Sequence, residues 1–112
     1  MKISKRIKIT RLDKRYSGYR QFRFSVEFIR GYMPNNDRLR TFLLVRDWCH
    51  DTWGHTCERD LHVELSEDIS KGEIEYSVNP AWSWYWHPNE SNYRIYLKDQ
   101  EELNIFAMRW LG

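Results

Sequence analysis

Apolar and polar residues alternate in two stretches of the first 29 residues. Residues 2–11 place Ile3, Ile7 and Ile9 on one side, and residues 19–29 do the same with Phe22, Phe24, Val26 and Phe28. A period of two residues is typical of a strand with one buried side, and residues 13–18 between the stretches have the composition of a turn. The sequence therefore predicts an antiparallel hairpin whose apolar side faces a core.

The charges of the chain are segregated along its length. Residues 1–40 carry twelve Lys and Arg against three Asp and Glu, a net +9, whereas residues 41–112 carry six against thirteen, a net −7. A dipole of this size steers association with charged partners. We therefore predict a surface for nucleic acid or a protein partner on the basic side of the hairpin, formed by Arg6, Lys8, Tyr19 and Arg23. The alternative is that these cations only keep edge strands from aggregating.

A helix is predicted over residues 37–53, which contain neither Gly nor Pro. At about 100° per residue, its apolar stripe consists of Leu39, Phe42, Val45, Cys49 and Trp53. Leu44 and Trp48 lie on the opposite side of this helix. We expect these two residues either to be covered by another part of the chain or to form an oligomer contact, such as that of a homodimer.

The rest of the chain predicts further strands and a closing helix. Alternation predicts strands at 61–65, 74–78, 82–86 and 93–97, with a connection at 66–72. Asp99 and Glu102 form a capping box, and the next apolar residues have the helical spacing i, i+3, i+4 and i+7: Leu103, Phe106, Ala107 and Trp110. The sequence thus predicts a single α+β domain over 1–112, in the order β-β-α-β-β-(β)-β-α. Its mostly antiparallel sheet has five or six strands, with two helices packed on one face.

Trp82, Trp84 and Trp86 recur at every second position and share one face of a predicted strand. One interpretation places the three rings in the core, against the closing helix. The other interpretation is an exposed aromatic platform for stacking or for protein contact, which Tyr85 and Tyr93 would extend. The exposure of Trp84 distinguishes the two.

Five thiol and imidazole side chains fall within fourteen residues: Cys49, His50, His55, Cys57 and His62. Thiolates and imidazoles bind zinc, so a zinc site formed by Cys49, His55, Cys57 and His62 is one alternative. The spacing argues against it, because zinc fingers pair their cysteines two to four residues apart and seven residues separate these two. Buried or surface side chains are the simpler interpretation, with free thiols in a reducing compartment.

Two segments carry a family resemblance. One runs from Arg46-Asp47-Trp48-Cys49 to Trp53-Gly54, and the other from Tyr96-Leu97-Lys98-Asp99 to Phe106-Ala107-Met108-Arg109-Trp110. Together they cover about a third of the chain and resemble small uncharacterised proteins of tailed bacteriophages, including the cyanophage type. The resemblance implies an accessory phage protein in the cytoplasm of an infected host cell, and it carries over no catalytic or binding residues.

The motifs of common enzyme classes are missing from the sequence. It has no glycine-rich phosphate loop, no H-E-x-x-H and no nucleophile elbow. It also has no apolar run long enough to cross a membrane. We therefore expect a non-enzymatic accessory or protein-interaction module without a cofactor, which binds a protein partner or itself. A nucleic-acid-binding protein is the alternative, and the zinc-dependent protein is a third.

Overall fold

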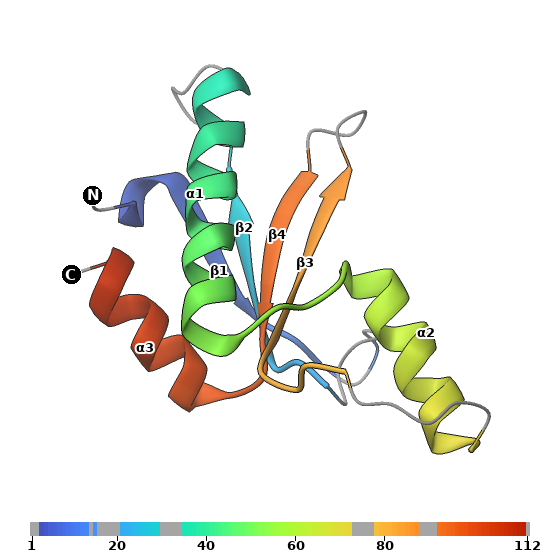
Figure 1. Ribbon diagram of the computed structural model, residues 1–112. Helices are drawn as coiled ribbons and strands as arrows, with labels where there is room; N and C mark the ends of the chain where they lie inside the picture. Colours follow the sequence, from blue (N-terminus) through green and yellow to red (C-terminus); the bar gives the residue numbers. More distant parts are fainter. Residues whose placement is uncertain are drawn as a thin grey trace.

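Four strands form an antiparallel sheet in the order β1-β2-β4-β3 (Figure 1). The computed structural model describes residues 3–13, 15, 21–29, 35–72, 78–87 and 92–111. Its strands are β1 (Ile7–Arg11), β2 (Phe24–Phe28), β3 (Trp82–His87) and β4 (Asn92–Leu97). Its helices are α1 (Asn35–Trp53), α2 (Arg59–Ser70) and α3 (Gln100–Trp110), and a 3-10 turn, η1 (Ser4–Arg6), precedes β1. The α+β class and the antiparallel sheet are confirmed, but the described residues form four strands and three helices instead of five or six strands and two helices.

The predicted N-terminal hairpin is present as β1 and β2. The two strands pair antiparallel from Ile7 opposite Phe28 to Arg11 opposite Phe24. The hairpin is shorter than predicted, because η1 takes the place of the first part of the predicted strand and a bend at Arg23 precedes β2. This bend takes Phe22 out of the alternation, so its buried ring lies 4.9 Å from the ring of His62 in α2 instead of beside Phe24.

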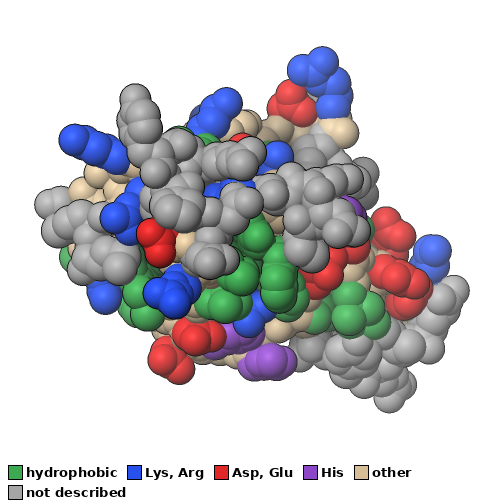
Figure 2. All heavy atoms as spheres, turned by 90° about the horizontal axis from the view of Figure 1, so that it is seen from above, with side chains coloured by type: hydrophobic (Ala, Val, Ile, Leu, Met, Phe, Trp, Pro, Cys, Tyr) green, Lys and Arg blue, Asp and Glu red, His purple; other side chains and the backbone are tan. Residues whose placement is uncertain are grey.

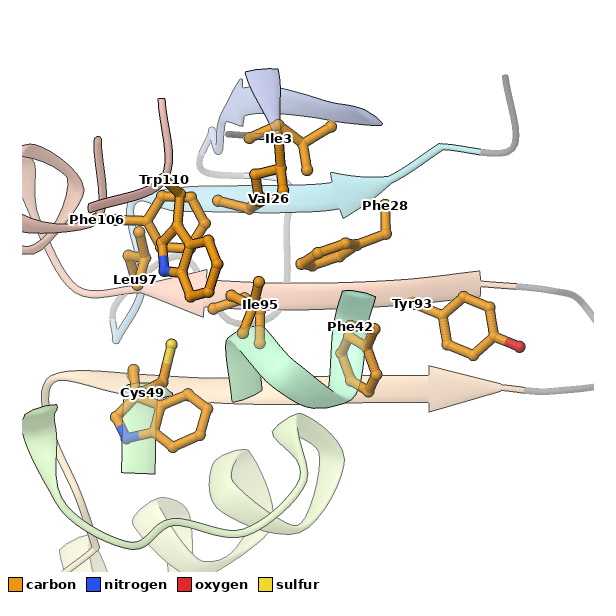
Figure 3. Packing of buried hydrophobic residues seen from close by; sticks show 13 residues of the cluster. Ile3, Val26, Phe28, Phe42, Cys49, Tyr93, Ile95, Leu97, Phe106 and Trp110 are labelled. Carbon is orange, nitrogen blue, oxygen red and sulfur yellow. The ribbon is translucent and has the colours of Figure 1, made fainter. Parts of the chain in front are cut away.

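α1 and α3 cover one side of the sheet, which we call the α1/α3 face. The core on this side joins sheet residues such as Val26 and Ile95 to Phe42 of α1 and Trp110 of α3 (Figure 3). The rings of Phe28 and Phe42 meet edge to face at 5.5 Å. Each buried ring removes ~150–250 Å² from water, so these aromatic contacts provide much of the stability of a small domain.

α2 lies on the opposite side of the sheet, which we call the α2 face. Successive side chains of a strand point to opposite faces, so Tyr85 and Tyr96 point away from Trp84 and Ile95. The Arg59 guanidinium at the start of α2 lies 5.2 Å from the ring centre of Tyr85 and 5.6 Å from that of Tyr96. The prediction that the helices pack on one face of the sheet therefore holds for α1 and α3, whereas α2 packs on the other face.

The predicted strand at 61–65 and the connection at 66–72 are wrong, because this segment forms α2. Leu61, which the alternation placed on a buried side, is 47% exposed. The stripe that turns inward has helical spacing and includes polar side chains, which hydropathy does not mark: His62, Leu65, Ser66 and Ile69. The predicted strand at 74–78 lies almost entirely outside the described residues, which resume at Val78.

Residues 54–58 carry the chain across the edge of β3, from one face of the sheet to the other. Gly54 ends α1 with a φ of 95°, a left-handed conformation that glycine adopts without a steric penalty. Its carbonyl accepts a hydrogen bond from Nε1 of Trp82 at 2.8 Å, and the Cys57 carbonyl accepts one from Oγ of Ser83 at 2.7 Å. Glu58 then forms an isolated bridge with Trp84. The strand edge at β3 is therefore partly closed by the protein itself.

The two ends of the described chain meet beside the sheet (Figure 1). The Ile3 amide donates to the carbonyl of Trp110 at 2.9 Å, and Ile3 is fully buried. α3 begins as predicted, since the Asp99 carboxylate accepts from the Gln100 amide at 2.8 Å. None of the described helices combines the length and the apolar character needed to span a bilayer.

Candidate functional site

The outer side of β1 is an open strand edge. β1 stands at one end of the sheet order and pairs only with β2 among the described residues. Its last four residues, Lys8 to Arg11, are all exposed. An edge of this kind offers unpaired backbone groups to a further strand, and natural proteins that do not use such an edge protect it.

The hydrogen-bond pattern fixes which backbone groups point outward. The Ile29 amide donates to the Arg6 carbonyl at 3.0 Å, and the Leu12 amide donates to the Arg23 carbonyl at 2.8 Å. Hydrogen-bonded positions alternate in an antiparallel pair, so Lys8 and Thr10 also direct their backbone groups toward β2. The amides and carbonyls of Ile7, Ile9 and Arg11 consequently point toward the open edge.

The side chains of β1 give this edge a mixed character. Ile9 was predicted to be in the core, but its side chain is 37% exposed. The reason is its position at the edge, since the α1/α3 core extends as far as Ile7 and Val26 and stops short of Ile9. Arg11 follows on the same face, whereas Lys8 and Thr10 lie on the α2 face. The open edge thus combines an apolar side chain with two exposed cations.

The register places a row of charges across the α2 face. Lys8 pairs with Glu27, and Glu27 pairs with Arg94 of β4. Arg94 Nη2 lies 3.9 Å from Oε2 of Glu27. Positive, negative and positive side chains therefore alternate across three strands, and the row ends at Lys8 on the open edge.

The residues of the predicted basic surface are spread along the hairpin. Arg6 is half-buried in η1, Lys8 is exposed in β1, and Arg23 is exposed at the bend before β2. Arg6 is opposite Ile29 and Arg23 is opposite Leu12, which puts the two arginines about 20 Å apart at ~3.3 Å per strand residue. Tyr19 lies outside the described residues. Lys8 is the one member of this set whose backbone belongs to β1.

The Trp ladder faces α1. Trp82 is fully buried, while Trp84 and Trp86 are half-buried and pack against the core. The Arg46 guanidinium covers the ring of Trp84 at 4.7 Å from its centre. Figure 2 shows hydrophobic side chains reaching the surface in the middle of the molecule, beside histidines. The exposure of Trp84 is therefore intermediate between the core and platform interpretations.

His50 and His55 stack near the buried end of the ladder. Their ring centres are 4.9 Å apart with an interplanar angle of 19°, and His50 meets Trp82 edge to face at 4.7 Å. Burial lowers the pKa of His50, and the nearby His55 and Arg46 lower it further. Asp47 and Asp51 oppose this effect. The imidazole of His50 is thus held toward its neutral form.

The predicted oligomer contact divides into two different environments. Leu44 is 47% exposed on the surface of α1. Trp48 instead packs edge to face against Trp53, Phe106 and Trp110, at 5.3, 6.2 and 5.9 Å between ring centres. The aromatic contacts of Trp48 are therefore made within its own chain, where they join α1 to α3.

The alternative zinc ligands lie on different sides of the sheet. Cys49 is fully buried in the core of the α1/α3 face, where burial raises the pKa of its thiol. His62 is buried on the α2 face, and its Nε2 donates to the carbonyl of Asn79. Both cysteines are free thiols, which excludes a Cys49–Cys57 disulfide in this structure. Throughout the described ranges, no group of three or more His, Cys, Asp or Glu side chains is placed to hold a metal ion.

Comparison with known proteins gives no relative. The chain matches no family model, no curated protein and no solved structure. The features of the open edge therefore have to be assessed on their own chemistry.

The sequence predicted one cation of this edge, Lys8, but not its second cation, its exposed apolar side chain or its open backbone groups. Ile9 was assigned to the core, and Arg11 was not among the predicted contact residues. A signal was present, because Arg11 continues the face of Ile7 and Ile9 and ends it with a charge. A cation that continues the alternation of apolar residues along a strand indicates where that face of the strand is no longer covered by helices.

Proposed function

We propose that this protein is a non-enzymatic interaction module that binds a partner protein by strand addition along β1. The observation that carries the proposal is the open edge, where the amides and carbonyls of Ile7, Ile9 and Arg11 point away from β2. In strand addition the main-chain hydrogen bonds supply affinity, and side chains at alternate positions supply specificity. The exposed Ile9 and the flanking cations provide such side chains.

Nucleic acid is the competing partner, and the character of β1 favours protein. Binding of single strands generally combines cations with aromatic rings on which bases stack. β1 contains no aromatic residue, and the side chain exposed in its middle is that of Ile9. The predicted aromatic contact, Tyr19, lies outside the described residues. Lys8 also stands directly opposite the acidic Glu27.

For the cellular role, we keep the prediction made from the sequence. The resemblance to small proteins of tailed bacteriophages supports an accessory role in the cytoplasm of an infected cell. Strand addition suits an accessory protein, because it requires one edge and no catalytic group. The phage origin and the location stay predictions.

A single backbone donor tests the proposal. Ile9→Pro removes the outward amide and leaves the β1–β2 hydrogen bonds in place, since proline is tolerated on the solvent side of an edge strand. Ile9→Val is the matched control, because it keeps both the amide and a β-branched side chain. We expect the wild-type protein and Ile9→Val to capture the same partner from host lysate. Ile9→Pro should not capture it.

The purified complex provides the second measurement. We expect the amides of Ile7, Ile9 and Arg11 to gain protection from hydrogen exchange on binding, while those of Lys8 and Thr10 are already protected. Equal capture by all three proteins would contradict the proposal. Binding of a single-stranded oligonucleotide that weakens steeply with salt and protects none of the three amides would favour the nucleic-acid alternative.

A further inference from the structure

The rows of paired residues across the sheet indicate what a strand beside β1 should present. On the α2 face, one row runs from Arg94 through Glu27 to Lys8 and alternates in charge. Opposite charges on directly paired strand positions attract each other and like charges repel. The next position outward from Lys8 therefore favours a carboxylate.

The neighbouring row on the α2 face is polar. It consists of hydroxyl-bearing side chains from all four strands: Ser83, Tyr96, Ser25 and Thr10. Hydroxyl pairs of this kind stabilise opposed strands. The position outward from Thr10 therefore favours Ser or Thr.

Three rows reach the open edge on the α1/α3 face. One row pairs Phe28 with the buried Ile7, and a second apolar row ends at Ile9, following Ile95 and Val26. An apolar residue outside Ile9 would cover the side chain that is now 37% exposed. The third row ends at the exposed Arg11, after Leu97 and Phe24. A carboxylate outside Arg11 would pair its guanidinium.

We infer that the partner of β1 is an extended acidic segment in which carboxylates, a hydroxyl and apolar residues occupy defined positions. This inference rests on the proposed strand addition. An antiparallel segment read from its N-terminus has an acidic residue opposite Arg11, a hydroxyl opposite Thr10 and an apolar residue opposite Ile9. It continues with an acidic residue opposite Lys8 and an apolar one opposite Ile7.

A second copy of this chain is a poor occupant of the same edge. Antiparallel pairing of two β1 strands about Ile9 would place Lys8 opposite Thr10 and Arg11 opposite Ile7, which leaves both cations without a carboxylate. Residues 3–12 carry four cations, Lys5, Arg6, Lys8 and Arg11, and no acidic residue. Two such strands would bring eight positive charges together at one edge, and like charges at this range repel.

The acidic helix α2 of this chain also does not supply the strand, because its described residues are helical. The exposed carboxylates of α2 include Asp60, Glu64 and Glu67, and α2 packs against β3. Figure 2 shows acidic side chains gathered at the end of the molecule where α2 lies. In the described part of the chain, exposed cations thus lie along β1 and exposed carboxylates lie along α2, which packs against β3.

A designed peptide tests the inference on the full-length protein. The probe is acetyl-Gly-Ser-Glu-Thr-Val-Glu-Ile-Ser-Gly-amide, and its matched control replaces both Glu residues with Gln. Titrations are followed by the amide NMR signals of β1. We expect the probe to shift Ile7, Ile9 and Arg11 and to bind on the order of fivefold more tightly than the control, from two partly exposed charge pairs. Lys8→Glu should remove most of that preference.

Backbone-blocked peptides separate the inference from the proposed function. N-methylation at the Val opposite Ile9 removes an amide that bonds to the edge, whereas N-methylation at the Thr opposite Thr10 does not. Loss of binding with the first alone supports strand addition. Equal binding of the acidic and neutral peptides, with this N-methyl effect intact, would overturn the acidic specificity and leave strand addition standing.

Three other outcomes would contradict the proposed strand addition or assign a different occupant to the edge. Binding of the acidic peptide that is insensitive to both N-methyl groups and to Ile9→Pro would contradict strand addition itself. Concentration-dependent dimerisation with protection of the β1 amides would identify a second copy as the occupant instead. Shifts produced by a single-stranded oligonucleotide and by neither peptide would assign the surface to nucleic acid.

Discussion

The two edges of the sheet differ in whether another part of the same chain contacts them. At β3, residues 54–58 of the same chain cross the edge, where Glu58 bridges to Trp84 and the carbonyls of Gly54 and Cys57 accept hydrogen bonds from the side chains of Trp82 and Ser83. At β1, the outward backbone groups of Ile7, Ile9 and Arg11 have no partner among the described residues. The residues of β3 are buried or half-buried and mostly aromatic, whereas four of the five residues of β1 are exposed and two of these carry a positive charge.

This difference suggests how stability and recognition are distributed in the protein. The closed edge collects large buried side chains and several side-chain-to-backbone bonds, so changes there should act on folding. The open edge carries exposed side chains whose contacts with the rest of the chain are few, so changes there should act on binding. The following experiments test that division, beginning with the largest expected effect.

Truncating the buried tryptophan of the closed edge should have the largest effect on stability. Trp82→Ala removes a fully buried ring and its hydrogen bond to Gly54. We expect the free energy of unfolding to fall by about 3–5 kcal/mol, measured by denaturant titration. Trp82→Phe keeps most of the ring volume and should cost about 1 kcal/mol, from the lost donor. Equal losses for the two variants would show that packing at Trp82 is not the main contribution.

Removing the Asn79 side chain should have a smaller effect on the same edge. Its Nδ2 donates to the carbonyls of Trp53 and Gly54 at 2.9 and 3.1 Å, and its Oδ1 accepts from the Ala81 amide at 2.9 Å. We expect Asn79→Ala to lower the free energy of unfolding by about 2 kcal/mol. Asn79→Asp keeps the acceptor and loses the donor, so thermal denaturation should place it between the wild type and the alanine variant only if both groups contribute.

The equivalent truncation at the open edge should hardly change stability. Ile9→Ala shortens a side chain that is 37% exposed, and we expect a loss of less than about 1 kcal/mol in the same denaturant titration. Binding of the acidic probe peptide should nevertheless weaken, because the apolar contact opposite Ile9 is lost. A loss comparable to that of Trp82→Ala would mean that the two edges do not differ in the way described here.

The smallest expected effect concerns pH at the closed edge. The pKa of His50 lies below its ordinary value of 6.5 in the folded protein, mainly because of burial, so the unfolded chain binds the proton more readily. Stability therefore rises with pH through this range, and the contribution is lost as pH falls below about 6.5. His50→Asn should flatten this part of the profile in thermal unfolding between pH 5 and 8. An unchanged profile would assign the dependence to another group.

Several elements were predictable because each is specified by its own local pattern. The stripe of Phe42, Val45 and Cys49 predicted α1, and the capping box at Asp99 predicted the start of α3. The pairing of β1 with β2 followed from two alternating stretches separated by a short turn. The segment 61–65 was misassigned because three aliphatic residues at alternate positions imitate a strand. Its actual buried stripe starts from a polar residue, His62.

The candidate site was only partly predictable. Lys8 was identified from charge alone, since an exposed cation needs no knowledge of the fold. Ile9 was assigned to the core because alternation reports which side chains share a face and not whether that face is covered at a given strand. The α1/α3 core ends before Ile9, and this depends on where the helices lie across the sheet.

The sequence by itself determined α1, α3, the hairpin of β1 and β2 and the opposite charges of residues 1–40 and 41–112, because these depend on residues close together in the chain. Tertiary structure alone decided that β1 is an edge, that α2 crosses to the other face and that Arg94, Glu27 and Lys8 form one row. Strand order and helix placement arise from contacts between residues far apart in the chain, and no local period encodes them.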